Sequence, residues 1–284
     1  MKSNAAMPDL SIVIVNYKTR DLLHDCLMSL MVVPLILEII VVDNASNDGS
    51  AAMVAQDFPQ VMLLKQSTNT WFCGGNNIGI RQATSDYVLL LNPDTTVPSD
   101  SLLKMLNYLR QHPDYGGVTC QLRYPDGSIQ RTCSKRPTYS YLLFANTTLG
   151  LLLAPLKKSV MQQHWYSDWE RTTDQDVEVM PGSCMVLHRE EALLNETLLL
   201  YFPEDDLAQR LKKPFRFLAQ THILHHEKSS TQSWRATQVY FHDLYLYTRI
   251  YHGLAGMLLM WLLSQPLYLG LWIKRHLIRR GLHG

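Results

Sequence analysis

The sequence has 284 residues, enough for one large domain or two small ones with a substantial hydrophobic core. Its formal net charge is +1, so there is no basic excess to follow a phosphate backbone, and we expect no nucleic acid among its partners. The five cysteines are scattered without CxxC spacing, which argues against both a disulfide framework and a zinc site.

Residues 1–9 lack the apolar run of a signal peptide, and we expect a short disordered lead before a cytosolic domain. Up to residue 115, apolar runs rich in β-branched residues alternate with stretches of helical periodicity. The predicted strands are 10–15, 38–42, 61–64 and 87–91, and the predicted helices are 21–31, 50–57, 77–83 and 101–111. This order predicts an α/β fold in which a mostly parallel sheet carries flanking helices.

Polar residues follow the predicted strands at the carboxyl edge of the sheet, where ligands bind in open α/β folds. These residues are Asn16, Asp43, Asn69 and Asp94. Their convergence on one edge indicates a binding site more strongly than any single motif does.

Asp94 follows the strand predicted at 87–91. Pro93 has no amide hydrogen and biases Asn92 toward extended backbone, so the chain leaves the sheet with Asp94 at the strand end. The Asp94 carboxylate, together with the Asn92 amide, is suited to a hard divalent cation that holds a diphosphate. The alternative is that Asp94 caps the following helix or closes an Asx turn.

Gly74 and Gly75 precede the helix predicted at 77–83. Paired glycines let the backbone approach a ligand closely, and a helix N-terminus favours an anion. The spacing is not that of a dinucleotide-binding loop, and a simple turn is the alternative.

Beyond residue 115 the pattern is less regular. A strand at 117–123, a turn at 125–127 and a return at 128–132 predict a hairpin. The strand-like segment 177–187 has a Pro-Gly break that would place residues 182–184 against a substrate. The apolar stretch 139–155 either packs on the surface or lines a groove for an acceptor.

Three adjacent carboxylates, Glu204, Asp205 and Asp206, stand at the predicted start of an amphipathic helix. Capping and the helix dipole explain one or two acids there. Three crowded acids raise the proton affinity of at least one of them, as a general base near neutral pH requires.

Three histidines, His222, His225 and His226, follow an apolar segment. His225 comes directly after an apolar pair, as at the end of another strand, and would complete the coordination that begins at Asp94. A packed or solvated histidine is the alternative.

The tail, residues 233–284, is aromatic up to residue 251, apolar from 253 to 273 and basic beyond. The apolar part approaches the ~20 residues that span a bilayer. Its central Ser264-Gln265-Pro266 favours a bent segment at the membrane surface, held by anionic headgroups. A full span and a buried core helix are the alternatives.

Six segments, in this order, resemble the family 2 glycosyltransferases, in particular the rhamnosyltransferase-like branch that builds bacterial surface polysaccharides. They are SIVIVNYKTRDLL, EIIVVDNASNDGS, NTWFCGGNNIGI, YVLLLNPDTTV, YPDGSIQR and VEVMPGSCMVLHRE. The resemblance implies a GT-A fold over 10–232, with a nucleotide-sugar-binding half at 10–115 and an acceptor-binding half at 116–232. It also implies a nucleotide-diphosphate sugar donor, Mg²⁺ or Mn²⁺, and transfer with inversion at the anomeric carbon.

The resemblance assigns two groups of donor-contacting residues. The residues expected around the nucleotide are Asn16, Tyr17, Asp43, Asn44 and Ser46. Among them, Asp43 would contact the base or the ribose. In the Asn- and Gly-rich donor loop they are Asn69, Gly74, Gly75 and Asn76.

Asp94 matches the metal-binding acid of the family, and Asn92 stands where many members have a first Asp. His225 matches a late histidine of the family. Because Lys228 occupies a place that is usually small, His226 is a rival for that role.

The base is the least regular part of the match. The family shows Glu-Asp-x-Asp-Leu with the second residue as base, whereas this chain has Pro-Glu-Asp-Asp-Leu. We take Asp205 as the base. If the register instead holds backwards from Asp206, Glu204 is the base.

The expected function is an inverting glycosyltransferase of cell-envelope glycan synthesis at the cytoplasmic face of the inner membrane. It would move a sugar, such as the deoxyhexose rhamnose, to a lipid-linked or polysaccharide acceptor. The alternative is a catalytically degenerate scaffold that binds a nucleotide sugar at the membrane. A nucleotidyltransferase is disfavoured because no Gly-rich phosphate loop with Arg or Lys occurs near the start of the sequence.

Overall fold

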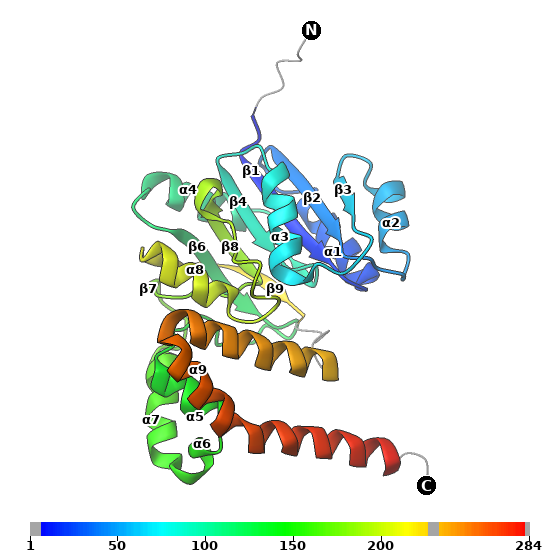
Figure 1. Ribbon diagram of the computed structural model, residues 1–284. Helices are drawn as coiled ribbons and strands as arrows, with labels where there is room; N and C mark the ends of the chain where they lie inside the picture. The colour runs from blue at the N-terminus through cyan, green and yellow to red at the C-terminus, as the bar shows by residue number, and fades with distance from the viewer. Residues whose placement is uncertain (1–6, 227–232, 282–284) are drawn as a thin grey trace.

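The computed structural model describes residues 7–226 and 233–281, so Lys228 lies outside the described residues. A mixed sheet forms the centre of the described part (Figure 1). The strand order is β3-β2-β1-β4-β8-β6-β9-β5, and β7 pairs with β9.

The first half is a parallel α/β unit, as predicted. Its strands are β1 (Leu10–Asn16), β2 (Leu37–Asp43), β3 (Met62–Lys65) and β4 (Tyr87–Leu91). Its helices are α1 (Arg20–Leu30), α2 (Ser50–Asp57) and α3 (Trp71–Gln82). Because β1 pairs in parallel with both β2 and β4, the carboxyl ends of these strands lie along one edge.

The second half adds strands of both directions. They are β5 (Thr95–Thr96), β6 (Gly117–Arg123), β7 (Gln175–Val177), β8 (Cys184–His188) and β9 (Phe215–His225). The helical elements of this half are α4 (Ser101–Gln111), the 3-10 turn Arg189–Glu191 and α8 (Pro203–Leu211). The strand β8 is antiparallel to both β4 and β6, and it joins the two halves into one sheet.

Both faces of the sheet are buried. Ile12 of β1 enters a core that includes residues of α1, α2 and α4, whereas its neighbour Val13 enters a second core with residues of α3 and α8. Leu89 and Leu90 of β4 divide between the two cores in the same way. Two cores explain why these strands are continuously apolar rather than alternating.

Helix α3 begins earlier than the predicted residue 77. Trp71 starts it with a φ of 62°, and the Trp71 amide donates to Asn69 Oδ1 at 2.7 Å. A Cβ at Gly75 would lie 2.7 Å from Val15 Cγ1 of β1. The glycines therefore lie inside a helix, where Gly75 permits close packing on the sheet.

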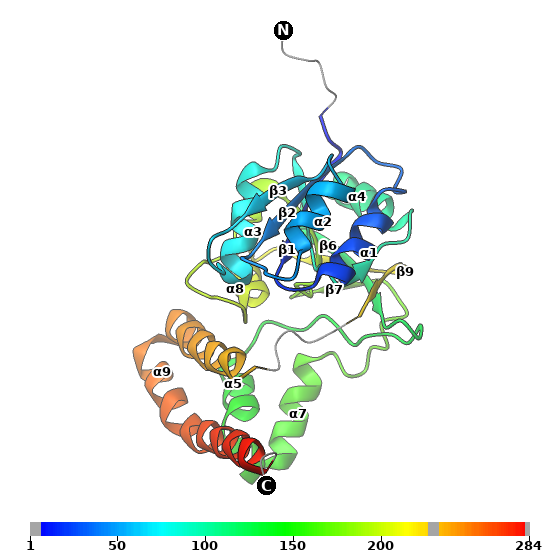
Figure 2. The same cartoon turned by 90° about the vertical axis from the view of Figure 1, so that its right-hand side faces the viewer.

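One other segment differs from the sequence-based expectation, and another, for which the sequence predicted no elements, is helical. The hairpin return expected at 128–132 is reduced to a single bridge between Arg123 and Ile129. The segment 136–175 contains three helices, α5 (Tyr139–Asn146), α6 (Leu149–Leu152) and α7 (Ala154–His164). In Figures 1 and 2 these helices lie beyond the sheet, next to the later part of α9.

Helix α9 (Trp234–Gly281) changes direction at Gly253, which has φ 73° and ψ 178°. Before this residue, Phe241, Leu244 and Tyr247 are buried in the second core, and after it Met260 joins them. The packed core therefore extends past the domain boundary expected at residue 233. By length and composition, Trp234–Arg275 is also a candidate membrane helix, since an 18-residue window within it has a mean hydropathy of 1.5.

Candidate active site

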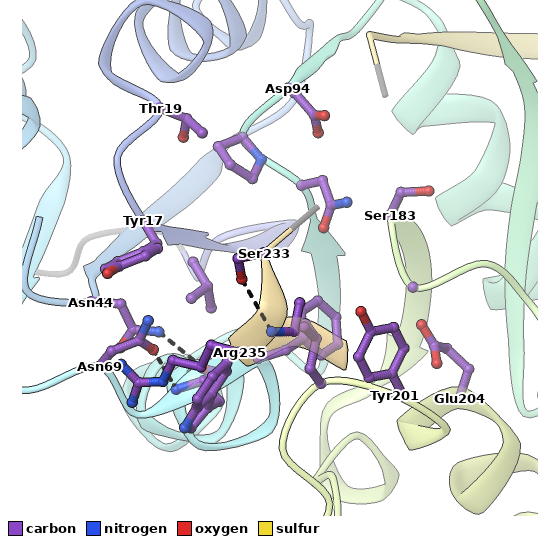
Figure 3. A pocket seen from close by; sticks show the side chains of 18 of the residues that line it. Tyr17, Thr19, Asn44, Asn69, Asp94, Ser183, Tyr201, Glu204, Ser233 and Arg235 are labelled. Atoms are coloured by element: carbon purple, nitrogen blue, oxygen red, sulfur yellow. Dashed lines mark hydrogen bonds between the residues drawn. The ribbon is translucent and has the colours of Figure 1, made fainter. Parts of the chain in front are cut away.

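A cavity of about 670 Å³ opens at the carboxyl edge of β1, β2 and β4 (Figure 3). Of the residues expected from the sequence, those that line it are Tyr17, Asn44, Asn69, Asn92, Asp94, Glu204 and His225. Those that are not among its lining residues are Asn16, Asp43, Ser46, Gly74, Gly75, Asn76 and Asp205. Figure 3 shows Asp94, Ser183 and Glu204 around one space, although they come from three different segments.

Asp94 and His225 form one corner of the cavity. The His225 Nε2 atom lies 3.4 Å from Asp94 Oδ1, because β5 pairs β9 and brings Thr95 opposite His225. Gln130 fixes the imidazole: its Nε2 donates to the His225 carbonyl at 2.8 Å, and its Oε1 lies 2.9 Å from His225 Nδ1. Since Oε1 can only accept, Nδ1 carries the proton in this contact, and Nε2 is the ring nitrogen that faces the Asp94 carboxylate.

Asn16 and Asp43, at the ends of β1 and β2, form a buried polar pair. Asn16 Nδ2 donates to Asp43 Oδ1 at 2.8 Å and to Ser46 Oγ at 3.1 Å, and the Ser46 amide donates to Asp43 Oδ2 at 3.1 Å. Thr19 Oγ1 donates to Asn16 Oδ1 at 2.7 Å. These bonds tie together the loops after β1 and β2.

Asn44 holds the segment that enters α3. Its Nδ2 donates to the Trp71 carbonyl at 3.0 Å, and its Oδ1 accepts from the Thr70 amide at 3.1 Å. The Trp71 ring then lies 4.9 Å from the guanidinium of Arg235, and both side chains line the cavity. Asn76 points away from this site, since its Nδ2 donates to the Phe72 carbonyl inside the helix.

Glu204 lies at the start of α8 and reaches into the cavity over Gly182. A Cβ at Gly182 would overlap the Glu204 carboxylate, so the Pro181-Gly182 break noted in the sequence makes room for this side chain. Burial raises the pKa of Glu204 to about 7, against a smaller opposing effect of the Glu204 and Gly182 backbone amides. A carboxylate with this pKa is half deprotonated near neutral pH, as a general base needs.

The other two acids of α8 have different surroundings. Asp206 is buried and accepts from Arg210 Nε at 2.8 Å and from the Tyr251 hydroxyl at 2.7 Å, which gives it a structural role. Asp205 is half-buried, and burial, with the Glu204 and Asp206 charges, raises its pKa. Of the three acids, only Glu204 lines the cavity, whereas Asp205, taken as the base from the sequence, does not.

Several site residues were not found by reasoning from the sequence. Arg235, Ser233 and Tyr201 line the cavity, although the first two belong to the segment expected to be a separate tail. Asp243 of α9 is fully buried and accepts from the amides of Leu199, Leu200 and Tyr201, with distances of 2.8 to 3.1 Å. Asp243 is the only carboxylate in 233–284, and this isolation in an apolar segment was a signal that it has a buried partner.

The family model described as glycosyl transferase family 2 matches residues 11–190. The chain belongs to glycosyltransferase family 2. The matched residues include Asn16, Asp43, Asp94 and Gly182, whereas Glu204, His225 and α9 lie beyond them. The family predicted from the six sequence segments is thus confirmed.

Two curated relatives have similar sequences. A low-salt glycan biosynthesis hexosyltransferase of Haloferax volcanii is 26% identical over 73% of this chain and 62% of its own length. An N-acetylglucosaminyl-diphospho-decaprenol L-rhamnosyltransferase of Mycobacterium tuberculosis is 24% identical over 69% of this chain and 68% of its own length. The chain therefore spans about two thirds of the length of either relative.

Solved structures confirm the GT-A fold. A mannosyltransferase of Pyrobaculum calidifontis, in complex with GDP-Man and Mn²⁺, has a TM-score of 0.55 at 17% identity and covers 86% of this chain and 65% of its own. GalNAc-T7, with UDP, GalNAc and Mn²⁺, has a TM-score of 0.57 at 12% identity and covers 86% of this chain and 48% of its own.

Proposed function

We propose that this chain is a metal-dependent, inverting glycosyltransferase that moves a hexose from a nucleotide-diphosphate sugar to an acceptor hydroxyl. The observation that carries the proposal is that Asp94, His225 and Glu204 line one cavity. That cavity thus offers a metal-binding corner and a group able to accept a proton. Both are needed for a displacement at an anomeric carbon in which the leaving group carries two phosphates.

The Asp94–His225 corner fits a divalent cation. His225 Nε2 and Asp94 Oδ1 face each other at 3.4 Å, and a cation between them would be held by the carboxylate and by the neutral imidazole. No cluster of three or more His, Cys, Asp or Glu side chains suited to a metal occurs among residues 7–226 and 233–281. This suits Mg²⁺ or Mn²⁺, which bind few protein ligands and take others from substrate phosphates and water. When bound, the ion supplies charge that stabilises the leaving nucleoside diphosphate.

The donor would occupy the part of the cavity bounded by Tyr17, Asn44, Asn69 and Trp71. Tyr17 offers an exposed ring beside the end of β1, while Asn44 and Asn69 hold the entry to α3. Asn16, Asp43 and Ser46 shape this region from below through their mutual hydrogen bonds. The cation of Arg235, placed over Trp71, adds positive charge for the diphosphate.

Glu204 would accept the proton of the attacking hydroxyl. Its carboxylate points into the same space as Ser183, and its pKa of about 7 suits that step. A single displacement, with the acceptor opposite the leaving group, inverts the anomeric centre.

A lipid-linked or polysaccharide acceptor, and a place at the cytoplasmic face of the inner membrane, complete the proposal. One relative is named for glycan biosynthesis and the other for a decaprenol-linked substrate. An O-antigen biosynthesis protein of Myxococcus xanthus is 27% identical over 78% of this chain and 18% of its own length. A deoxyhexose such as rhamnose is the donor sugar that the second relative suggests. Thermal shifts with a panel of nucleotide sugars and Mn²⁺ would identify the donor.

The paired variants Glu204→Gln and Asp205→Asn test the assignment of the base. We expect Glu204→Gln to lower the rate of donor turnover by about 10²- to 10⁴-fold, the usual contribution of a general base, with the donor Kd unchanged. Asp205→Asn should retain most of the activity, because Asp205 does not line the cavity.

The reverse ranking of the two variants would return the role to Asp205. A wild-type protein that binds donor, yet shows neither transfer nor slow donor hydrolysis with Mn²⁺ and any acceptor tried, would favour the scaffold.

A further inference from the structure

The connection between α6 and α7 forms an apolar tip on the end of the molecule away from the start of the sheet (Figures 1 and 2). Four leucines are exposed there: Leu151 (71%), Leu152 (76%), Leu153 (43%) and Leu156 (54%). So many adjacent large apolar side chains are unusual on a surface that contacts only water. We name these four residues the leucine tip.

The part of α9 after Gly253 presents a second apolar surface. Leu254, Leu258 and Leu262 recur at the spacing of one helix face and are 58%, 51% and 60% exposed. We name these three the α9 stripe. The opposite face of this helix packs against the rest of the protein. Met260 and Ser264 on that face are fully buried, and the Ser264 hydroxyl lies 2.8 Å from the Tyr245 hydroxyl.

The leucine tip and the α9 stripe belong to one structural unit. Helix α5 packs against both α7 and α9. The Tyr139 hydroxyl of α5 donates to the Gly256 carbonyl of α9 at 2.8 Å, and the Tyr139 ring contacts that of His252. Two segments that are about a hundred positions apart in the sequence are therefore held together beyond the sheet (Figure 2).

The charged residues in the two segments that carry these surfaces are all basic. Neither 139–163 nor 244–284 contains an Asp or a Glu. Lys157 and Lys158 follow the leucine tip directly, and Lys274 and Arg275 follow the apolar part of α9. Basic residues beside exposed leucines match a surface that is apolar inside and negatively charged at its boundary.

We propose that the leucine tip and the α9 stripe together dock this chain on a bilayer containing anionic lipid, with α9 lying along the surface. Two separate apolar contacts explain stable attachment better than one, since a single short apolar anchor gives only weak, reversible binding. The bilayer is favoured over a protein partner because the apolar groups are flanked by cations without any carboxylate. This proposal does not depend on the identity of the donor or of the base.

The packing of α9 also argues against a membrane span. Leu267 and Tyr268 still pack against the second core, as Met260 does, so the protein holds one side of the helix along much of its apolar stretch. A bilayer span needs about 20 apolar residues free to enter the hydrocarbon core. When α9 lies along the membrane surface, the cavity at the carboxyl edge of the sheet is on the membrane side of the molecule.

A fluorescent label at the leucine tip tests the proposal directly. All five native cysteines are buried, so Leu152→Cys provides one exposed thiol for an environment-sensitive dye on the full-length chain. With vesicles of phosphatidylcholine and phosphatidylglycerol, we expect a blue shift and increased intensity. The matched control is Val32→Cys, which is 69% exposed and precedes the amino end of β2, and its emission should not change.

Sedimentation with the same vesicles measures the contribution of each contact. Leu151→Glu with Leu152→Glu should lower the partition coefficient about tenfold or more, since burying even one leucine is worth that much. Lys157→Glu with Lys158→Glu should reduce binding to the anionic vesicles, with little change for pure phosphatidylcholine. Val32→Glu with Ile36→Glu, both exposed near the opposite end of the sheet, should bind as the wild type does.

Each contrary result overturns the proposal in a different way. Unchanged emission at residue 152 together with wild-type sedimentation of the double glutamate variant would mean that α9 alone meets the membrane. Emission at residue 152 that shifts with protein concentration in the absence of lipid would mean that a second copy covers the tip. Thermal unfolding of each variant separates these results from loss of fold.

Discussion

The carboxylate of Glu204 lies where its charge is disfavoured and its proton affinity is high. Burial raises its pKa to about 7, well above the ordinary value of 4.5. The side chain keeps this position because Gly182 leaves room for it, and the loop before α8 is fixed by Asp243. One glycine and one buried acid therefore set the properties of the proposed base.

The rate of transfer should depend on pH through Glu204. The base acts in its deprotonated form, so kcat/KM should fall as the pH is lowered through about 7 and level off above it. Initial rates from pH 5.5 to 9 check this, with Asp205→Asn as the control that keeps the same inflection. A profile without an inflection near 7 would remove Glu204 from the step.

Gly182→Ala should impair turnover while leaving the fold intact. The new methyl group would overlap the Glu204 carboxylate, which must then rotate out of position. We expect kcat to fall by about tenfold or more, since small displacements of a catalytic group have effects of this size or larger. Gly270→Ala is the control, because its Cβ would meet nothing within 4 Å. Wild-type kcat in Gly182→Ala would show that the position of Glu204 over Gly182 is not needed.

Gln130 should tune the Asp94–His225 corner without binding the metal itself. Gln130→Ala removes the acceptor that orients His225 Nδ1, and outer-shell losses of this kind lower metal affinity about 10- to 100-fold. Calorimetry of Mn²⁺ binding in the presence of donor measures the change. Gln111→Ala, on the exposed end of α4, should have no effect. Equal Mn²⁺ affinity in both variants would argue against His225 as a ligand.

At the scale of elements, the strands of the first half were predictable and the start of α3 was not. The runs at 10–15 and 87–91 are apolar at every position because each strand is covered on both faces, and that pattern is visible in the sequence. Helix α3 begins with Trp71 at positive φ and passes through a Gly-Gly pair, which local propensity opposes. Contacts of Asn44 and Val15 from other segments, with the local hydrogen bond to Asn69, outweigh that propensity.

The first part of α9 supports the loop that lines the candidate site, through the hydrogen bonds of Asp243. Asp243→Ala would leave the amides of Leu199, Leu200 and Tyr201 without their acceptor, and each unsatisfied buried group costs about 1–3 kcal/mol. We expect a loss of about 3 kcal/mol or more in the free energy of unfolding, measured by urea denaturation. Asp114→Ala, on an exposed turn, should change it little. A stable Asp243→Ala protein with full activity would show that α9 does not support the loop.

At the scale of the whole molecule, the sequence predicted which strand ends meet but not what encloses them. Asn16, Asp43, Asn69 and Asp94 follow parallel strands, so their shared edge follows from chain order alone. The placement of Arg235 and Ser233 in the cavity depends on how α9 folds back beside α3 and α8, which is a tertiary contact without a local signal. The same packing joins the proposed membrane contacts to the cavity.

Gly253 gives the molecule its overall bend. With φ at 73°, it holds a conformation that residues with a side chain rarely adopt, and its Cβ position is open to solvent. Beyond it, Met260 and Ser264 are buried, so the turn at Gly253 fixes the direction in which the rest of α9 leaves the domain. A side chain at this position would strain the turn, and the proposed membrane contacts would then meet the bilayer at a different angle to the cavity.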